Sequence, residues 1–408
     1  MKNFSSQKII VFLAFLASAA FSQVASAVPA YARQTNLACN SCHFQSFPAL
    51  NELGRTFKAG GYTMMGTQKL VNGLALPETL NAGVVTKIRY QQSSGAKVDG
   101  TNNTNDGQLQ FPDELLLMVG GRVGENIGAQ LELNLNSSGT EPVVANFKMP
   151  FIYDVSGVKT GVVLFTTADQ GVSYGFELMN TGAVRGARIM EARSSFSAQQ
   201  YIGSATAAEG IAVVASNSMF FANISKWSPR SVGAANSGAP TANYVRLAIT
   251  PKVGNWDAAV GVQSWSGSAT LPTLVQNDTK AYAVDAQMQG EVATMPLGIY
   301  LTYANASATE AGGIPNLFNG AANAKTAVTI AGQVGVIPGK ATVLAAYRKG
   351  DNGAAANNGD NSLMIGGNFL LEQNVQLQLN HEMFSGSKYD TTQANGDRLT
   401  TLMLFAAF

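Results

Sequence analysis

The only two cysteines of the chain, Cys39 and Cys42, enclose Asn40 and Ser41 and are followed directly by His43. Two thiols at this spacing can each add across a vinyl group of a haem, and the adjacent imidazole can then ligate the iron from one face. The pattern predicts one covalently attached haem c, with His43 as the proximal axial ligand. The alternatives are a disulfide between the two cysteines with the histidine incidental, or a zinc site, which needs four ligands although the chain holds only one other histidine.

A short helix is expected downstream of this motif. Ser46 is a residue type that caps helices, Pro48 suits a first turn, and Gly60-Gly61 would end the helix. The Pro48 carbonyl is also a candidate acceptor for the ring N–H of His43, because metal-bound histidines usually have such a partner. The same proline could equally serve only to start the helix.

One face of this helix would carry Leu50, Leu53 and Phe57, which fall at i, i+3 and i+7. Such a stripe suits a haem plane, and it suits packing on protein equally well. Pro48, Leu50 and Phe57 are therefore the candidates for a haem pocket. Arg55 and Lys58 lie off the stripe, where they could reach haem propionates or the helix C-terminus, although isolated basic residues generally face solvent.

A second strong axial ligand would have to come from His381 or from the 13 methionines. Met64 and Met65 follow the expected helix after a glycine-containing reversal and are the candidates for the distal position. His381 has the parity of the apolar residues of a late strand, which places it on the apolar face and away from a haem. A methionine pair in a connector is more often simple packing.

The N-terminus has the features of a secretory signal peptide, removed from the mature protein. They are Lys2 and Lys8, the apolar run Ile9–Phe21, and the small residues Ala25 and Ala27. We expect the signal to span residues 1–27, with a second cleavage site available near residues 30–32. No later stretch has the roughly 18 unbroken apolar residues of a membrane-spanning helix.

The composition excludes several classes of protein. Charged residues make up 12% of the chain, about half of the roughly 25% that is usual for globular domains, and hydrophobic residues make up 46%. The formal charge of +1 becomes −1 when Lys2 and Lys8 are removed, so nothing favours nucleic-acid binding. With 42 glycines and 13 prolines, the sequence favours short strands joined by polar turns.

From about Asn81 onward, apolar and polar residues alternate with a period of two. Segments of about ten residues with one apolar and one polar face are typical of an outer-membrane β-barrel, and a soluble β-sandwich would show a similar pattern. In the barrel hypothesis, one set of side chains contacts outer-membrane lipid and the other faces the lumen. We expect Ile88, Leu133, Val284 and Leu377 to face lipid, and Lys87, Arg89, Glu132, Asp285 and Gln378 to face the lumen.

Two further features favour the barrel. Polar segments recur between the strands, as at Ser93 to Asp106, Ser231 to Ala242 and Gly350 to Asn361. The chain also stops on a strand, Leu399 to Phe408, whose terminal aromatic resembles the assembly signal of bacterial outer-membrane barrels. The sequence holds roughly sixteen candidate strands, which is within the range of single-chain barrels. The predicted fold class is therefore all-β, an antiparallel transmembrane barrel with a small helical N-terminal domain.

The N-terminal region resembles the fused monohaem cytochrome–porins of bacterial outer membranes, whose best-known members oxidise iron. The resemblance covers about residues 29 to 62 and rests on Pro29-Ala30-Tyr31-Ala32-Arg33-Gln34-Thr35, Cys39 to His43, Phe47-Pro48-x-Leu50, Gly54-Arg55-x-Phe57-Lys58 and Gly61-Tyr62. It implies a monohaem cytochrome over residues 28–77 that plugs or caps a porin-like barrel over residues 78–408.

This resemblance implies an iron(II)-oxidising oxidoreductase that takes electrons from extracellular Fe(II) and passes them to a periplasmic carrier such as a soluble cytochrome c. The fusion itself favours electron transfer, because a solute porin needs no cofactor and a periplasmic cytochrome needs no barrel. The alternatives are a passive solute porin with a haem-bearing plug, and a haem peroxidase. Luminal carboxylates such as Glu132 and Asp285 could guide Fe(II), although wetting the lumen would be sufficient reason for them.

Overall fold

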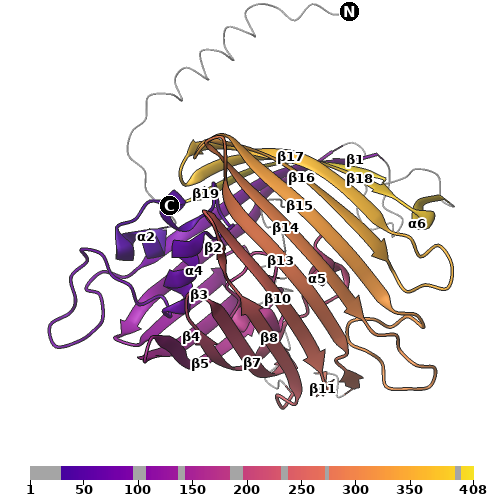
Figure 1. Cartoon of the computed structure of the whole chain (residues 1–408), viewed down its shortest axis with the longest axis horizontal. Coiled ribbons are helices and arrows are strands. Elements are labelled where there is room, and N and C mark those ends of the chain that lie inside the picture. Colours follow the sequence, from indigo (N-terminus) through magenta and orange to yellow (C-terminus); the bar gives the residue numbers. More distant parts are fainter. Residues whose placement is uncertain are drawn as a thin grey trace, which may run out of the picture.

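The structure, a computed structural model, describes residues 29–94, 107–136, 143–183, 196–230, 238–271, 275–390 and 397–408. The expected signal peptide lies outside these ranges, as do most of the polar segments beginning at Ser93 and Ser231. Long antiparallel strands form one tilted barrel (Figure 1). The wall strands are β1 (Ala82–Ser93), β2 (Gln108–Gly124), β3 (Ile127–Asn134), β4 (Val144–Val155), β5 (Val158–Thr167), β6 (Ala208–Ser216), β7 (Phe220–Pro229), β8 (Ala242–Ile249), β9 (Lys252–Val253), β10 (Trp256–Ser266), β13 (Ala281–Val292), β14 (Met295–Ala306), β15 (Lys325–Ile337), β16 (Ala341–Asp351), β17 (Asn361–Glu372), β18 (Val375–Ser385) and β19 (Arg398–Ala407).

The barrel closes where the last strand meets the first. β1 pairs with β19 over the register from Val85 opposite Ala407 to Ser93 opposite Leu399, and β1 pairs with β2 on its other side. β8 and β9 both pair with β10, so they form a single interrupted strand. Counted in this way, the described residues form a closed antiparallel barrel of sixteen strands, which confirms the predicted fold class.

The alternation of the sequence corresponds to the two faces of this wall. The residues expected to face the lumen, Lys87, Arg89, Glu132, Asp285 and Gln378, are all buried. Val284 and Leu377 are exposed on the outside, and Ile88 and Leu133 are half-buried there. The predicted register is confirmed. Leu377 is the third residue of β18, so it lies near one end of the strand.

The two ends of the barrel differ in the length of their connections. At one end, the connections β2–β3, β4–β5, β6–β7, β13–β14, β15–β16 and β17–β18 each contain three residues or fewer. At the other end, the connections are long, and one of them spans residues 168–207 between β5 and β6. The N-terminal helices and the C-terminus lie at the end with the short turns (Figure 1). A small two-stranded sheet, β11 (Ser268–Thr270) with β12 (Gln276–Asp278), and α6 (Ser387–Asp390) lie in long connections.

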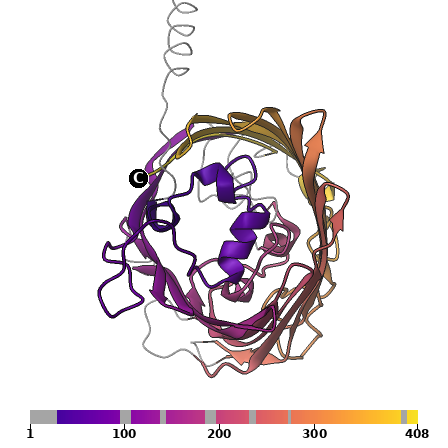
Figure 2. The same ribbon diagram turned by 60° about the vertical axis from the view of Figure 1, so that its left-hand side comes forward.

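Two segments enter the lumen (Figure 2). The first, which we call the plug, is residues 29–62 and contains α2 (Pro29–Thr35), α3 (Cys39–Cys42) and α4 (Glu52–Ala59). The second, the inward segment, is residues 168–207, of which 168–183 and 196–207 are described; it contains η1 (Val172–Gly175) and α5 (Ala198–Tyr201), and residues 171–182 are buried throughout. Among the described residues, no helix has the length and apolar character needed to cross a bilayer.

The expected helix begins later than predicted. Asn51 caps α4, its side-chain oxygen accepting a hydrogen bond from the Gly54 amide at 3.0 Å, and the helix starts at Glu52. Ser46 and Pro48 precede it in an irregular loop, so the proposed Ser46 cap was wrong. The expected end at Gly60 is confirmed. Asn is as good a helix cap as Ser, and here the acidic Glu52 also follows in the first turn, where the helix dipole favours it.

Candidate functional site

A cavity of about 250 Å³ lies between the plug and the wall on the side of β1 to β4 and β19. Six sequence-predicted residues line it together: Cys39, Cys42, His43, Pro48, Leu50 and Phe57. Apolar wall residues Val85, Leu116 and Phe405 face them, and Lys58, Lys87 and Lys148 also contribute to the lining. The cavity therefore combines two thiols and an imidazole with apolar surfaces and cationic groups.

The thiols are held by the single turn of α3. Cys39 is buried and Cys42 is half-buried, and neither forms a disulfide. The chain leaves the helix at His43 in an extended conformation, and His43 pairs with Leu50 as an isolated β-bridge. This bridge places the imidazole beside the two sulfurs on the cavity wall.

The imidazole of His43 is oriented by the backbone. Its Nδ1 lies 3.2 Å from the carbonyl oxygen of Ala49, which also accepts the Phe44 amide at 2.8 Å. The Pro48 carbonyl, the candidate acceptor from the sequence, also interacts with the ring, but its effect is smaller than that of Ala49. Burial lowers the pKa of His43 to about 4, against a smaller opposing effect of the hydrogen bonds to Ala49 and Pro48. The side chain is consequently neutral at neutral pH, which is the metal-binding form, and Nε2 is left for a ligand.

Two residues pack the Cys39–Cys42 turn against α4: Asn51, which was not among the residues predicted from the sequence, and Gly54, which belongs to a motif that carries the family resemblance. The Asn51 side chain donates to the Ser41 carbonyl at 2.9 Å while capping α4. At Gly54, a Cβ atom would stand 2.2 Å from the Cys42 carbonyl oxygen, so only glycine permits this approach. The sequence signals were an asparagine directly before a helix and a glycine within it.

The distal ligand candidates are not brought to the cavity. Met64 is exposed, and neither Met64 nor Met65 is among the residues that line the cavity. His381 lies on the outer face of β18, where its Nδ1 is 2.9 Å from the Thr400 hydroxyl, as its parity indicated. Of the predicted stripe, Leu53 is 37% exposed and is also absent from the lining.

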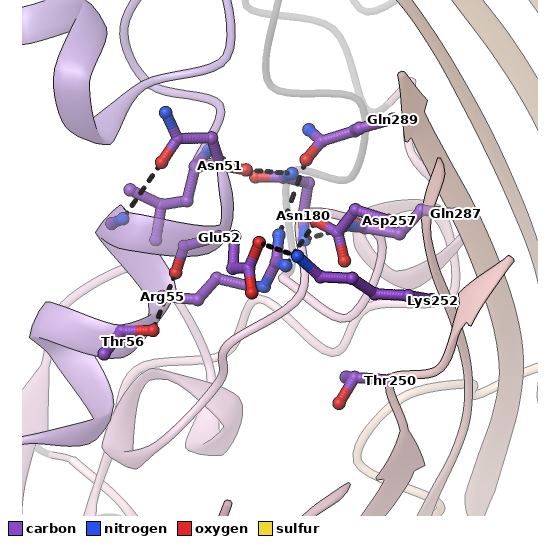
Figure 3. Close-up of polar contacts among 12 residues, drawn as sticks. Asn51, Glu52, Arg55, Thr56, Asn180, Thr250, Lys252, Asp257, Gln287 and Gln289 are labelled. Carbon is purple, nitrogen blue, oxygen red and sulfur yellow. Dashed lines mark hydrogen bonds and ion pairs between the residues drawn. The ribbon is translucent and has the colours of Figure 1, made fainter. Parts of the chain in front are cut away.

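Arg55 anchors the plug to the wall. It is buried, contrary to the expectation that it faces solvent, and it pairs with Asp257 of β10 and donates to Gln289 of β13 at 3.4 Å (Figure 3). Nearby, Glu52 makes a second ion pair with Lys252 at 2.6 Å, but both of these side chains are exposed. The plug is thus joined to the barrel by one buried and one exposed ion pair.

Replacing Arg55 by alanine is expected to weaken the docking of the plug by about 3 kcal/mol, because it leaves the Asp257 carboxylate without its cation in a largely buried site. The measurement is the rate at which chymotrypsin, which cleaves after Phe and Tyr, cuts the plug in the folded barrel, and this rate should rise. Lys252→Ala is the matched control, and it should leave the rate unchanged because its ion pair is solvated. Equal rates for Arg55→Ala and Lys252→Ala would contradict this assignment.

The two carboxylates considered for guiding Fe(II) have protein partners. Asp285 pairs with Arg246, at 2.5 and 3.0 Å, and accepts a hydrogen bond from Thr181 at 2.7 Å. Glu132 accepts from Gln130 at 2.6 Å and from Asn146 at 2.7 Å. These bonds connect wall strands to one another and to the inward segment. Both carboxylates are therefore accounted for by their protein partners inside the barrel. In the described ranges, no three or more His, Cys, Asp or Glu side chains gather in a form suited to a metal ion.

The residues of the cavity fit a covalently held haem. Cys39 and Cys42 lie on one turn and form no disulfide, and His43 is neutral and held through Nδ1 in the way that ligating histidines usually are. Phe57 and Phe405 offer apolar surfaces for a macrocycle. The charges in the lining are of both signs, because Glu114, which pairs with Lys87, lines the cavity together with Glu132 and Glu177.

Comparison with solved structures identifies the wall. The fold matches a five-fold mutant of the porin of Rh. blastica with a TM-score of 0.50 and 15% identity, covering 81% of this chain and 100% of that one. The outer-membrane channel DcaP of Acinetobacter baumannii matches with a TM-score of 0.48 and 12% identity, over 81% and 97% of the two chains. A loop-deletion mutant of the Vibrio cholerae outer-membrane protein OmpT matches with a TM-score of 0.47 and 12% identity, covering 81% of this chain and 99% of that one. No protein-family model and no curated protein sequence matches the chain.

The chain is a porin-like outer-membrane β-barrel. The exposed apolar outer face and the closed wall satisfy the two requirements of strands in a bilayer, since lipid contacts apolar side chains and no strand edge is left unpaired. In such barrels the short turns face the periplasm and the long loops face the outside. The plug of this barrel therefore enters from the periplasmic end.

Proposed function

We propose that this barrel is an outer-membrane electron-transfer protein with one haem c in its lumen, bound through Cys39 and Cys42 and ligated by His43. The observation that carries the proposal is the joint presence of the two thiols and the oriented imidazole on the wall of one cavity inside the barrel. A bound haem would supply a one-electron centre. The protein would hold it, keep it from bulk water and tune its potential through His43 and the groups around it.

We further propose Fe(II) at the cell surface as the electron donor and a soluble periplasmic cytochrome as the acceptor, as the resemblance of residues 29 to 62 implies. A haem held by Cys39, Cys42 and His43 would supply a one-electron acceptor, so that each Fe(II) would lose one electron to become Fe(III) with no proton transfer. The entry of the plug from the end with short turns supports an acceptor on the periplasmic side.

The test is stopped-flow mixing of the purified holoprotein with Fe(II) at the growth pH of the organism. We expect the α-band of ferrous haem c to appear with a rate proportional to the Fe(II) concentration. A control with Zn(II) should leave the spectrum oxidised, because Zn(II) cannot donate an electron. A haem that dithionite reduces but Fe(II) does not would refute iron as donor while leaving the haem site intact.

The porin-like wall favours a second candidate, a passive solute channel in which the haem domain is only a plug. The discriminating measurement is ion conductance in planar bilayers for wild type and for Cys39→Ala with Cys42→Ala. Large and equal conductance in both proteins would support the channel. In the electron-transfer proposal conductance is small, because the plug and the buried inward segment occupy the lumen.

A further inference from the structure

Asn180 of the inward segment binds the plug at Leu50, which follows the Ala49 carbonyl that holds the proposed proximal histidine, His43. Its side chain is buried, and both of its polar atoms bond to one residue: Oδ1 accepts from the Leu50 amide at 2.8 Å, and Nδ2 donates to the Leu50 carbonyl at 3.0 Å. These two hydrogen bonds fix the orientation of the backbone at Leu50 and leave it little freedom to rotate.

The Leu50 amide belongs to the same peptide group as the Ala49 carbonyl, whose oxygen holds Nδ1 of His43. A hydrogen bond accepted from the N–H of a peptide polarises that peptide and makes its carbonyl a stronger acceptor. The Asn180 side chain therefore acts on His43 through one intervening peptide, although it lies 130 residues from Leu50 in sequence.

Asn180 is in turn fixed to the wall. Its backbone N–H donates to Oε1 of Gln287 on β13 at 2.9 Å, and Gln287 is buried. A continuous series of hydrogen bonds thus runs from Gln287 through Asn180 and the Ala49–Leu50 peptide to the imidazole. The rigid barrel wall sets the position of the ring through this series, which the plug alone does not provide.

We propose that Asn180 is a positioning residue that tunes the iron ligand His43, an inference that rests on the proposed haem function. By strengthening the bond from Nδ1–H to Ala49, it gives the imidazole more anionic character and makes it a better donor to ferric iron. The predicted consequence is a lower haem midpoint potential and a firmer iron–histidine bond than the plug would give without the inward segment.

The test compares Asn180→Ala with Asn223→Ala in the purified full-length holoprotein. Asn223 is a matched control, because it is buried and bonds to the inward segment at the Phe176 carbonyl at 3.0 Å but does not touch the plug. We expect Asn180→Ala to raise the midpoint potential and to increase the high-spin fraction in the visible spectrum, while Asn223→Ala matches wild type. Unchanged potential and spin state in a folded Asn180→Ala barrel would overturn the proposal, and so would equal shifts in both variants.

Gln287→Leu supplies a second arm if Asn180→Ala fails to fold. This variant keeps the Asn180 side chain but removes the acceptor of the Asn180 backbone N–H. We expect the midpoint potential to rise by less than in Asn180→Ala. An unchanged midpoint potential would count against the proposal. Folding is followed by the migration of unheated barrel in electrophoresis, which does not depend on haem. A wild-type protein without covalent haem would refute the proposed function itself, and this outcome is distinct from haem-loaded variants with unaltered potentials.

Discussion

Replacing Cys39 and Cys42 together by alanine is expected to abolish all haem that survives denaturing electrophoresis, because thioether bonds need the two thiols. The thiols lie on one turn and line the same cavity. A variant that keeps only one of the two cysteines would therefore hold the haem by a single thioether bond. Wild-type protein, produced with a cytochrome c maturation system, should retain a peroxidase-active band at the mass of the protein. Loss of the stain from the wild-type band would eliminate the c-type assignment.

His43→Ala separates attachment from ligation. The thiols remain, so we expect a covalently bound but high-spin or poorly matured haem, visible as a displaced Soret band. Met64→Ala with Met65→Ala serves as the companion variant, since these side chains do not line the cavity and should leave the spectrum unaltered. A methionine-to-iron charge-transfer band in wild type that disappears in this variant would restore the methionines as ligands.

Arginine at Leu379 is expected to lower the free energy of unfolding by about 2 to 4 kcal/mol, the cost of a cation at the lipid-facing midplane of a barrel. Leu379 is 54% exposed on the outer face at the middle of β18. The measurement is equilibrium unfolding in guanidinium with the barrel folded in lipid vesicles, followed by the loss of heat-modifiable migration.

Leu377→Arg provides the depth control on the same face of the same strand. Leu377 lies two residues closer to the periplasmic turn, about 5 Å nearer the headgroups on a tilted strand, so the cost should be smaller than at Leu379. Equal costs at the two positions would contradict the placement of the strand in the bilayer. Gln378, between them, faces the lumen and is buried, so a substitution there reports on packing inside the barrel and not on contact with lipid.

The wall was predictable from sequence because polar and apolar residues alternate along each strand with a period of two. Lys87 and Arg89 alternate with Ile88 in β1, and the same period of two places Asp285 inside and Val284 outside in β13. The cavity motif was predictable for a similar reason, since Cys39 to His43 are adjacent in the chain and their chemistry depends on spacing alone.

The internal contacts of the lumen were not predictable in this way. Arg55 reaches Asp257 across 202 positions, and no local pattern distinguishes a basic residue that will be buried by such a partner from one that faces solvent. Residues 171–182 of the inward segment lack the period of two and have no amphipathic stripe, because they are buried throughout. The role of the inward segment, and that of Asn180, follows only from the closed wall around it.

The position of the motif inside a closed wall imposes an order on biogenesis. Once β1 and β19 have paired, Cys39 is enclosed and a maturation enzyme can no longer present a porphyrin to both sulfurs. In the proposed function, the haem is therefore ligated while the exported polypeptide is still unfolded in the periplasm. In that order, the strands from Ala82 to Ala407 would pair only after the haem has been attached.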